Sequence, residues 1–391
     1  MHILGFQERK FRMKKIVSCI CAAAMALSLS ACSKKEPDTR PLGEMRGISA
    51  AELIAEMGTG WNLGNTMDSE EGGETGWGNP VTTKEMIDEV HRAGFDTLRI
   101  PTTWKNSMGG APDYTVDSEW LKRLEEIVGY ALENDMYVII NTHHDTDWIK
   151  PQYEDVENVK VQLAALWTQI AEYFKDYGDH LIFEGLNEPR IVGGANEWNG
   201  GTEEGRDCLN QLNDVFVKTV RATGGNNETR TLLITTFAAQ PAASGVSALI
   251  VPDDKYVGVS IHAYTPYRFT YDSVGESWNT AVFDGSCASE IDSLFAGLNE
   301  AFISKGIPVI ITEYGSVSKM IDKTWYITNT EEVAKWAKHY VSAAEKYGIP
   351  CVWWDNGYHK SGNELFGIFN RRELTWYEPE VVTAIMESLN S

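Results

Sequence analysis

The sequence predicts an α/β protein in which eight parallel strands and their helices close into one (β/α)8 TIM barrel. Short apolar runs alternate with amphipathic stretches along most of the 391 residues. The runs number eight, and the chain length suits a single barrel. Most runs end in polar or aromatic residues, as expected where a barrel builds a site at the carboxyl ends of its strands.

The expected strands are apolar runs bounded by turn-forming or polar residues. They lie at Gly58–Gly64, Thr97–Pro101, Tyr137–His143, Leu181–Leu186, Thr231–Thr235, Val257–His262, Val309–Glu313 and Pro350–Trp354. The alternative is an open doubly wound sheet, which normally places a glycine-rich phosphate loop between its first strand and first helix. Gly58-Thr59-Gly60 is followed by Trp61-Asn62-Leu63 and not by a helix, so the barrel is favoured.

Amphipathic stretches between these runs predict the helices. They lie at Thr83–Ala93, Ser118–Asn134, Val159–Tyr177, Glu203–Thr223, Ser289–Lys305 and Glu331–Lys346. Thr83 and Ser118 carry side chains that N-cap positions favour, and Gly94 and Gly348 follow expected helix ends.

Residues 1–32 are predicted to be a signal peptide with a lipobox and are set apart from the fold. Met13-Lys14-Lys15 gives a basic start, with Met1 as the alternative initiator. The following run, Ile16–Ala31, is too short and too rich in Ser, Ala and Cys for a good membrane span. Leu29-Ser30-Ala31-Cys32 resembles a bacterial lipobox with Cys32 as the lipidated first residue; the alternative is an ordinary signal peptide that contains Cys32.

Residues 33–45 predict a charged, proline-containing tether, and residues 46–391 a single catalytic domain. Its cysteines, Cys208, Cys287 and Cys351, have no paired spacing that indicates a disulfide framework or a metal site. The formal net charge of −22 argues against a nucleic-acid partner, because such binding needs clustered Lys and Arg.

Two of the predicted strands end in a glutamate. The fourth leads into Asn187-Glu188-Pro189, where the proline cannot donate another ladder hydrogen bond, and the seventh ends in Glu313. Because the carboxyl ends of parallel strands meet at one end of a barrel, we expect Glu188 and Glu313 to face one cleft.

Polar or aromatic residues also end five other strands. They are Trp61, Asn62 and Asn65 on the first strand, Arg99 on the second, Asn141, His143, His144 and Asp145 on the third, His262 and Tyr264 on the sixth, and Trp353, Trp354, Asp355 and Asn356 on the eighth. Strand ends buried among helices are expected to be apolar unless a site is built there.

A pair of carboxyls suits the hydrolysis of sugar acetals, in which an acid protonates the leaving oxygen while an ionised partner attacks the anomeric carbon. Their environments must hold the two pKa values apart. Arg99 beside Glu313 predicts an ionised nucleophile, whereas Glu188, beside the neutral Asn187, predicts the acid. Asn187 is also suited to bind the sugar 2-hydroxyl, and Trp354 offers a flat apolar face.

Together these segments resemble glycoside hydrolase family 5, and most of all the bacterial endoglucanases of its subfamily 4. The resemblance runs from about Ile48 to Leu389, with the motifs in family order. They are Gly60-Trp61-Asn62-Leu63-Gly64-Asn65-Thr66, Leu98-Arg99-Ile100-Pro101, Asn141-Thr142-His143-His144, Leu186-Asn187-Glu188-Pro189, His262-Ala263-Tyr264, Thr312-Glu313-Tyr314-Gly315 and Trp353-Trp354-Asp355-Asn356.

The resemblance implies a retaining double displacement with Glu188 as acid/base and Glu313 as nucleophile. It implies that Arg99 orients and ionises the nucleophile, that Tyr264 bonds to it and that Asn187 holds the 2-hydroxyl. For Arg99 the alternative is a purely structural ion pair.

The resemblance also implies that His143 and His262 surround the subsite on the non-reducing side of the cut. Trp354 matches the stacking platform there, often followed in the family by a cis non-proline bond, and Trp353 is then core. Asn62 and His144 complete the expected substrate-binding set, with His144 behind the residues that touch the sugar.

A metal site made by His143, His144 and Asp145 is the alternative, as in amidohydrolase barrels. Such barrels carry His-x-His on the first strand, where this chain has Trp61 and Asn62, so we expect no metal and no cofactor. Other residues with assigned roles are Glu184, expected inside the barrel and paired to a polar group, and the candidate sugar platforms Trp77, Trp148, Trp198 and Trp278.

The sequence thus predicts a secreted endo-β-1,4-glucanase, a cellulase, that acts as a monomer on β-glucan polysaccharide and contacts the membrane only through a lipid on Cys32. The first alternative is the same chemistry on xyloglucan, mixed-linkage glucan, glucomannan or mannan. The second is a non-catalytic glycan-binding surface lipoprotein, although both carboxyls that catalysis needs are present.

Overall fold

The computed structural model describes residues 45–271, 279–321, 328–361 and 364–389. The predicted signal peptide, with its lipobox, and all but the last residue of the predicted tether lie outside these residues. None of the helices in the described ranges combines the length and the apolar surface that crossing a bilayer requires.

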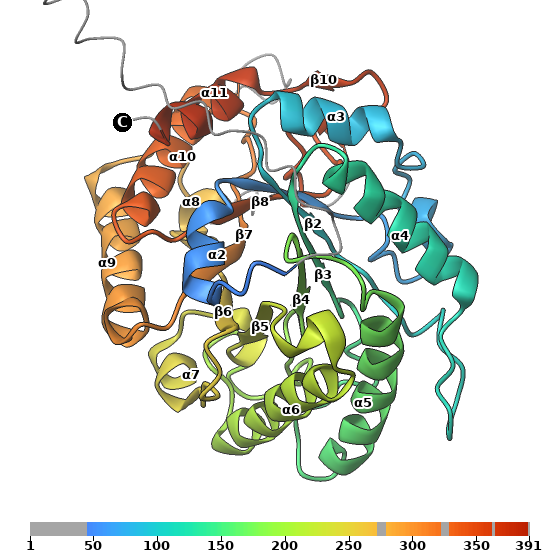
Figure 1. The fold of residues 1–391 in the computed structure, drawn as a ribbon. Coiled ribbons are helices and arrows are strands. Elements are labelled where there is room, and N and C mark those ends of the chain that lie inside the picture. Colours follow the sequence, from blue (N-terminus) through green and yellow to red (C-terminus); the bar gives the residue numbers. More distant parts are fainter. Residues whose placement is uncertain (1–44, 272–278, 322–327, 362–363, 390–391) are drawn as a thin grey trace, which may run out of the picture. The chain divides into compact units, whose positions relative to one another are not determined.

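Eight parallel strands close into a barrel in chain order, with β8 paired to β1, and helices surround it (Figure 1). The strands are β1 (Gly60–Leu63), β2 (Thr97–Ile100), β3 (Tyr137–Asn141), β4 (Leu181–Glu184), β5 (Leu232–Thr235), β6 (Val257–His262), β7 (Val309–Tyr314) and β8 (Cys351–Asp355). Each lies within a predicted run or extends it by one residue. The predicted TIM barrel is therefore confirmed.

The six predicted helices are all present. They are α3 (Lys84–Arg92), α4 (Ser118–Leu132), α5 (Val156–Tyr173), α6 (Glu203–Ala222), α9 (Gly285–Ala301) and α10 (Thr330–Glu345). Thr83 occupies the N-cap position of α3, but its side chain makes no capping hydrogen bond. The prediction for α4 was wrong, because the cap is Asp117, whose carboxylate accepts from the Glu119 amide, and Ser118 is already helical.

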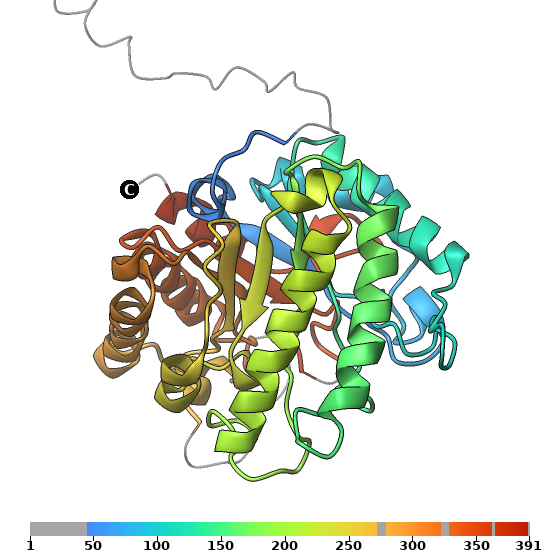
Figure 2. The same ribbon diagram turned by 60° about the horizontal axis from the view of Figure 1, so that its bottom comes forward.

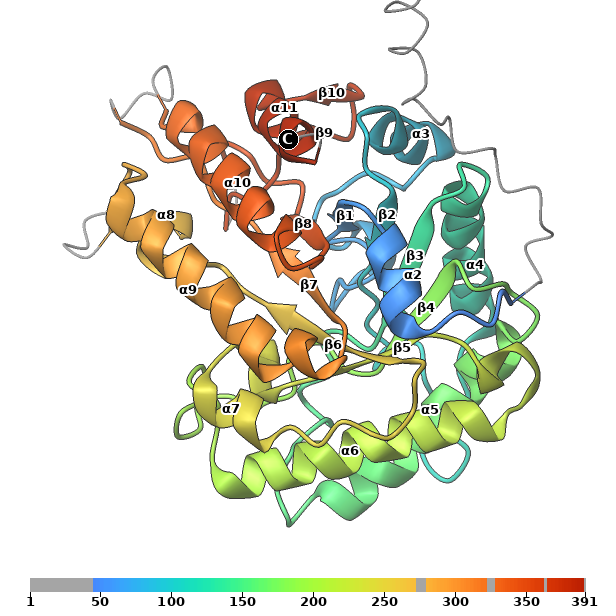
Figure 3. The same cartoon turned by 60° about the vertical axis from the view of Figure 1, so that its left-hand side comes forward.

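The sequence pattern missed the shorter elements. These are α2 (Ala50–Glu56), α7 (Ala243–Ala248), α8 (Tyr267–Thr270), α11 (Pro379–Ser388), the 3-10 turns Gly73–Thr75, Gly225–Glu228, Phe237–Ala239 and Ile303–Lys305, and the antiparallel pair β9 (Phe369–Asn370) and β10 (Thr375–Trp376). The long helices α5 and α6 lie side by side outside the barrel (Figure 2), and α10 packs between α9 and α11 (Figure 3).

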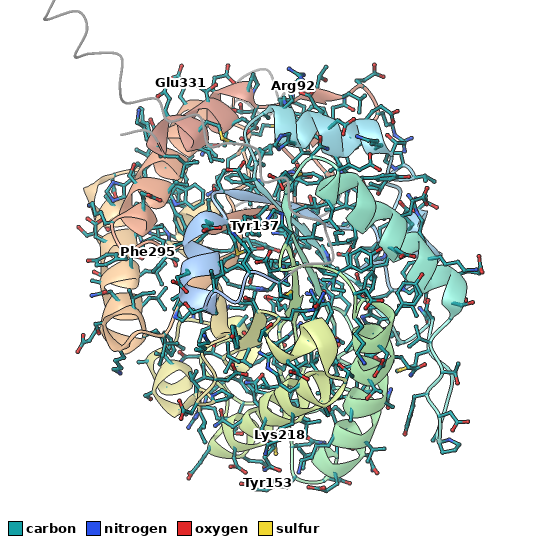
Figure 4. The ribbon with its side chains drawn as sticks, viewed as in Figure 1. Arg92, Tyr137, Tyr153, Lys218, Phe295 and Glu331 are labelled. Atoms are coloured by element: carbon teal, nitrogen blue, oxygen red, sulfur yellow. The ribbon has the colours of Figure 1, made fainter. Side chains whose placement is uncertain are left out.

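Helix α2 closes the amino-terminal end of the barrel, where it crosses the ring of strands (Figure 1). It begins with a capping box between Ser49 and Glu52. Its residues Leu53 and Ile54 pack against the inward side chains at the start of the strands. Tyr137, labelled beside α2 in Figure 4, donates to Glu56 (2.8 Å). The site is therefore confined to the carboxyl end.

The strands lose their regular register at that end. Pairing shifts between β6 and β7 at Ile261/His262 and between β7 and β8 at Ile311/Tyr314. The shift sets His262 opposite Glu313, while Tyr314 stays outside the barrel against Trp336 and Tyr340. The irregular ends allow neighbouring residues to take different faces of the sheet.

Candidate active site

Arg99 forms the centre of the site and is fully buried. Its Nη1 donates to Glu313 Oε1 (2.7 Å) and to Asn62 Oδ1 (2.9 Å). Its Nη2 donates to Asn187 Oδ1 (2.7 Å), and its Nε donates to Glu184 Oε2 (2.8 Å). One rigid guanidinium thus fixes side chains from β1, β4 and β7 and from the loop after β4.

Glu184 is a barrel-interior group with polar partners, as expected. Besides Arg99, it accepts from Asn141 Nδ2 (2.9 Å) and from the Ser260 hydroxyl. Arg99 therefore divides its charge between two buried carboxylates, with ion-pair distances of 2.6 Å to Glu184 and 2.7 Å to Glu313.

Asn62 and Arg99 belong to the predicted substrate-binding set, and the structure shows what their side chains contact. Asn62 is fully buried, and its Nδ2 donates to the carbonyls of Thr312 (2.9 Å), Val352 (3.3 Å) and Trp353 (3.2 Å). Its Oδ1 accepts from Arg99. Both side chains are fully buried, and their hydrogen bonds fix other residues of the site.

The two predicted catalytic carboxyls share the Nδ1 atom of His262. That atom lies 2.9 Å from Glu188 Oε1 and 3.4 Å from Glu313 Oε2. Tyr264 donates its hydroxyl to Glu313 Oε2 (2.8 Å). One oxygen of Glu188 and one of Glu313 lie within 4.8 Å of each other. Retaining glycosidases hold their carboxyls about 5–5.5 Å apart, and inverting ones about 6.5–9.5 Å apart.

The pKa directions of this pair differ from the sequence prediction. Burial raises the pKa of Glu313, and the charges of His262 and Arg99 offset only part of that rise. Burial also raises the pKa of Glu188, but the hydrogen bond and charge of His262 and the charge of Arg190 lower it by more. The charge of Glu188 adds to the rise at Glu313, whereas the pKa of Glu188 is lowered first by His262 and then by Arg190, 3.4 Å away, which the prediction left out.

Asn187 and His143 each present one free hydrogen-bond donor. Arg99 occupies Asn187 Oδ1, so the amide Nδ2 is left for a ligand. Asn141 Oδ1 accepts from the Thr102 amide (3.0 Å), so its Nδ2 donates to His143 Nδ1 (3.2 Å). His143 Nε2 then carries the proton, and burial lowers the pKa of His143, which keeps the ring neutral.

Trp354 lies beside His143 with the two rings nearly parallel, at 7° and with centroids 5.7 Å apart. His144 stands edge-on behind His143 (4.3 Å) and contacts Trp77 (5.5 Å). The bond after Trp354 is not cis; among the described residues the cis bonds are Ala111–Pro112 and Thr265–Pro266.

The alternative metal trio of His143, His144 and Asp145 does not assemble. Asp145 instead accepts from the amides of Trp104 (3.0 Å) and Lys105 (2.8 Å) and from the Trp148 indole (2.9 Å), and its burial raises its pKa to about 6.

Within the described ranges two groups offer three ligand atoms within 4.8 Å, namely Asp68 with His143 and His144, and Glu188 with His262 and Glu313. The Asp68 oxygens already accept from the amides of Asn65 (2.9 Å) and Thr66 (2.6 Å). The second group is the carboxyl pair with His262, whose Nδ1 already contacts both carboxyls. In each group, ligand atoms already have partners within the protein.

The candidate sugar platforms differ in exposure. Trp198 is 50% exposed on the loop after β4, whereas Trp77 is half-buried against His144. Trp148 packs on the core and bonds to Asp145, and Trp278 lies outside the described residues. Sequence reasoning missed Arg190, although a cation two positions after a proposed acid is a visible signal.

The sequence pattern described as cellulase (glycosyl hydrolase family 5) matches residues 60–360. The chain belongs to glycosyl hydrolase family 5. Endoglucanase A of Ruminococcus albus is 53% identical over 351 residues, which cover 88% of this chain and 94% of that protein. Endoglucanase B of Clostridium cellulovorans is 47% identical, covering 88% and 76%.

Solved structures of family 5 share both fold and sequence with this chain. A broad-specificity GH5-4 endoglucanase from Clostridium acetobutylicum superposes with a TM-score of 0.82 at 44% identity, covering 86% of this chain and 99% of that one. A GH5-4 endoglucanase from Ruminococcus champanellensis with bound cellotriose gives 0.82 at 41% identity, covering 88% and 99%. Among family 5 enzymes the chain is therefore most like subfamily 4.

Proposed function

We propose that this family 5 enzyme cleaves internal β-1,4-glucosidic bonds with Glu313 as nucleophile and Glu188 as acid/base. The observation that carries the proposal is the closeness of the two carboxyls: one oxygen of Glu188 and one of Glu313 lie within 4.8 Å of each other, and both groups approach His262 Nδ1. Such close carboxyls favour retention, because inverting enzymes hold theirs about 6.5–9.5 Å apart to leave room for a water.

In the first step a Glu313 oxygen bonds to the anomeric carbon as the glycosidic bond breaks, and the Glu188 proton passes to the leaving oxygen. In the second step water attacks the same carbon, gives its proton to Glu188 and releases Glu313. Each step inverts the anomeric configuration, so the product retains it.

The proton must reside on Glu188 when the first step begins. We infer that substrate shifts it there, because a negative Glu313 keeps its hydrogen bonds from Arg99 and Tyr264, whereas the leaving oxygen approaches Glu188. The two groups titrate as one pair, and the singly protonated pair is the reactive form.

Asn187 and His143 are the proposed hydroxyl-binding donors, and Trp354 the proposed stacking surface for the sugar on the non-reducing side. Asn187 Nδ2 suits the 2-hydroxyl because it lies next to Glu188 and is oriented by Arg99. His262 contacts both carboxyls, Tyr264 contacts Glu313, and His144 supports His143 from behind.

The substrate we propose is β-1,4-glucan, because relatives in subfamily 4 are endoglucanases and one holds cellotriose. Similar solved structures also include broad-specificity endoglucanases, a xyloglucan-specific endo-β-1,4-glucanase and a lichenase, which favours activity on xyloglucan or mixed-linkage glucan as well. Initial rates on carboxymethylcellulose, lichenan, xyloglucan and glucomannan, with Glu313→Gln as control, test this proposal. Hydrolysis that the substitution abolishes supports it; oligosaccharide binding without hydrolysis by the unmodified enzyme makes the chain a capture protein.

We also propose that the enzyme is secreted, held by a lipid on Cys32 and monomeric. A polymeric substrate requires action outside the cell, and the leader sequence supplies both a signal and a lipobox. Replacing Cys32 by Ser should move activity from the membrane fraction to the soluble fraction; unchanged membrane partition contradicts the anchor.

A further inference from the structure

Arg190 is a cation in contact with the proposed acid/base. It follows Glu188 by two residues, and its Nη1 lies 3.4 Å from Glu188 Oε2 and 3.1 Å from the Glu188 carbonyl. The other carboxylate oxygen, Oε1, faces His262 at 2.9 Å. Each oxygen of Glu188 therefore has its own nitrogen partner.

The Arg190 guanidinium is fixed by two further residues. Its Nε donates to Glu197 Oε1 (3.0 Å), and its Cζ atom lies over the Trp198 ring, 4.3 Å from the centroid. Glu197 also accepts from the Gly193 amide through Oε2 (2.7 Å), so the anion is bonded to the loop backbone. The side chains of Arg190 and Glu197 are only 16% and 17% exposed.

The loop that carries these residues has a defined conformation of its own. Gly201 has φ +67°, and a Cβ there would lie 2.6 Å from the Phe237 ring, so only glycine fits. Arg206 Nη1 donates to the carbonyls of Gly200 (2.9 Å) and Gly201 (2.8 Å). The base of the loop is therefore packed before any ligand arrives.

We propose that Arg190, fixed by Glu197 and Trp198, is a positioning residue that directs Oε2 of Glu188 toward the leaving oxygen. This inference rests on the proposed acid/base role of Glu188. His262 occupies Oε1, so Oε2 is the oxygen that transfers the proton. The looser Arg190 contact, at 3.4 Å, is the one that a glycosidic oxygen can replace.

Arg190 also acts on the proton equilibrium of the carboxyl pair. Its charge lowers the pKa of Glu188, after the larger contribution of His262 and ahead of that of His144. The other titratable groups that face Glu188 are Glu313, Tyr264 and Glu364. A lower pKa favours the ionised Glu188 that the second step needs as a base.

Glu197 and Arg190 act with opposite sign, and this allows a sharp test. Arg190→Gln removes the cation and leaves Glu197 uncompensated, so the alkaline limb of the kcat/KM profile should move up by roughly 0.5 to 1 pH unit. Glu197→Gln removes the anion that neutralises Arg190, so the same limb should move down. Arg221→Gln is the matched control, because Arg221 pairs with Asp254 (2.8 Å) and lies over the Tyr256 ring without contact to Glu188, and it should leave the limb in place.

Leaving groups give a second readout. Arg190→Gln should slow cello-oligosaccharide cleavage about 10-fold, but aryl cellobiosides with an acidic phenol much less, because such phenols need little protonation. Arg190→Lys keeps the positive charge but lacks the planar guanidinium. The alkaline limb of the kcat/KM profile should therefore stay in place, while the rate of cello-oligosaccharide cleavage should fall in part.

The outcomes separate the two proposals. Opposite limb shifts in the Arg190 and Glu197 variants support the positioning role. Equal rate losses on both leaving groups with an unmoved limb overturn it, provided Glu188→Gln still spares the acidic phenols. If Glu188→Gln fails to spare them, the acid/base assignment itself is wrong.

Discussion

Glu184 and Glu313 share one buried guanidinium. Arg99 contacts Glu184 at 2.6 Å and Glu313 at 2.7 Å, and the three side chains are almost completely buried. The cation is thus both a structural ion-pair partner and the group that orients the proposed nucleophile. The structural and catalytic interpretations of Arg99 are both consistent with these contacts.

Arg99→Met should therefore cost both stability and activity. Two buried carboxylates would lose their partner, which typically lowers the free energy of unfolding by about 3–5 kcal/mol. Urea unfolding measures this loss, and kcat per folded molecule should fall to background. Arg230→Met is the matched control, because Arg230 is fully buried but bonds to Asn227 and to backbone carbonyls such as Gly178 and Leu181. A similar loss of kcat in both variants would contradict a specific role for Arg99.

Tyr264→Phe removes the hydroxyl that donates to Glu313 Oε2 (2.8 Å). A hydrogen bond to a charged group contributes about 1.5–3 kcal/mol, so we expect kcat to fall roughly 10- to 100-fold. The acidic limb of the pH profile should move up, because the ionised nucleophile loses a donor. Tyr340→Phe is the control, because it removes a buried hydroxyl that donates to the Ala263 carbonyl (2.7 Å). Its kcat and the position of its acidic limb should stay near those of the unmodified enzyme. An unmoved limb in the Tyr264 variant would argue against this donor role.

Glu378, which precedes α11, should make the protein less stable as pH rises. Its burial raises its pKa from 4.5 to about 7. Between those values the folded state binds more protons than the unfolded state, so the free energy of unfolding falls with increasing pH. Glu378→Gln should remove that fall and stabilise the protein at pH 8 by up to about 3 kcal/mol, with little change near pH 4. Urea titrations at both pH values measure this change in the free energy of unfolding, with the exposed Glu373→Gln as control. Equal effects in the two variants would refute the buried-carboxyl explanation.

Much of the fold was predictable because barrel strands are short, apolar and bounded by turns. Helix α2 was missed although Ser49 and Glu52 form a capping box that the sequence displays. The helix is only seven residues long, so its apolar periodicity is weak. Its role in closing the barrel depends on contacts with Tyr137 and Ile310, far away in the chain.

The site was predictable in its residues but not in their partners. Strand-end polarity identifies Glu188, Glu313 and Arg99, yet spacing cannot show that Arg99 also binds Glu184. Asn62 lies in a motif that resembles the family, but its side chain turns inward, which the pattern alone does not indicate. The closed barrel brings Glu184 and Glu313, which are far apart in the sequence, to the same cation, Arg99.

The most direct test of the mechanism is to trap the covalent intermediate. A 2-deoxy-2-fluoro-β-cellobioside with an acidic aryl leaving group slows both steps, but the good leaving group lets the first step proceed. Intact-protein mass spectrometry should show one added fluorocellobiosyl group, and peptide mapping should locate it on Glu313, with no adduct in Glu313→Gln. An adduct on another residue, or hydrolysis with inverted product configuration and no adduct, would contradict the double displacement.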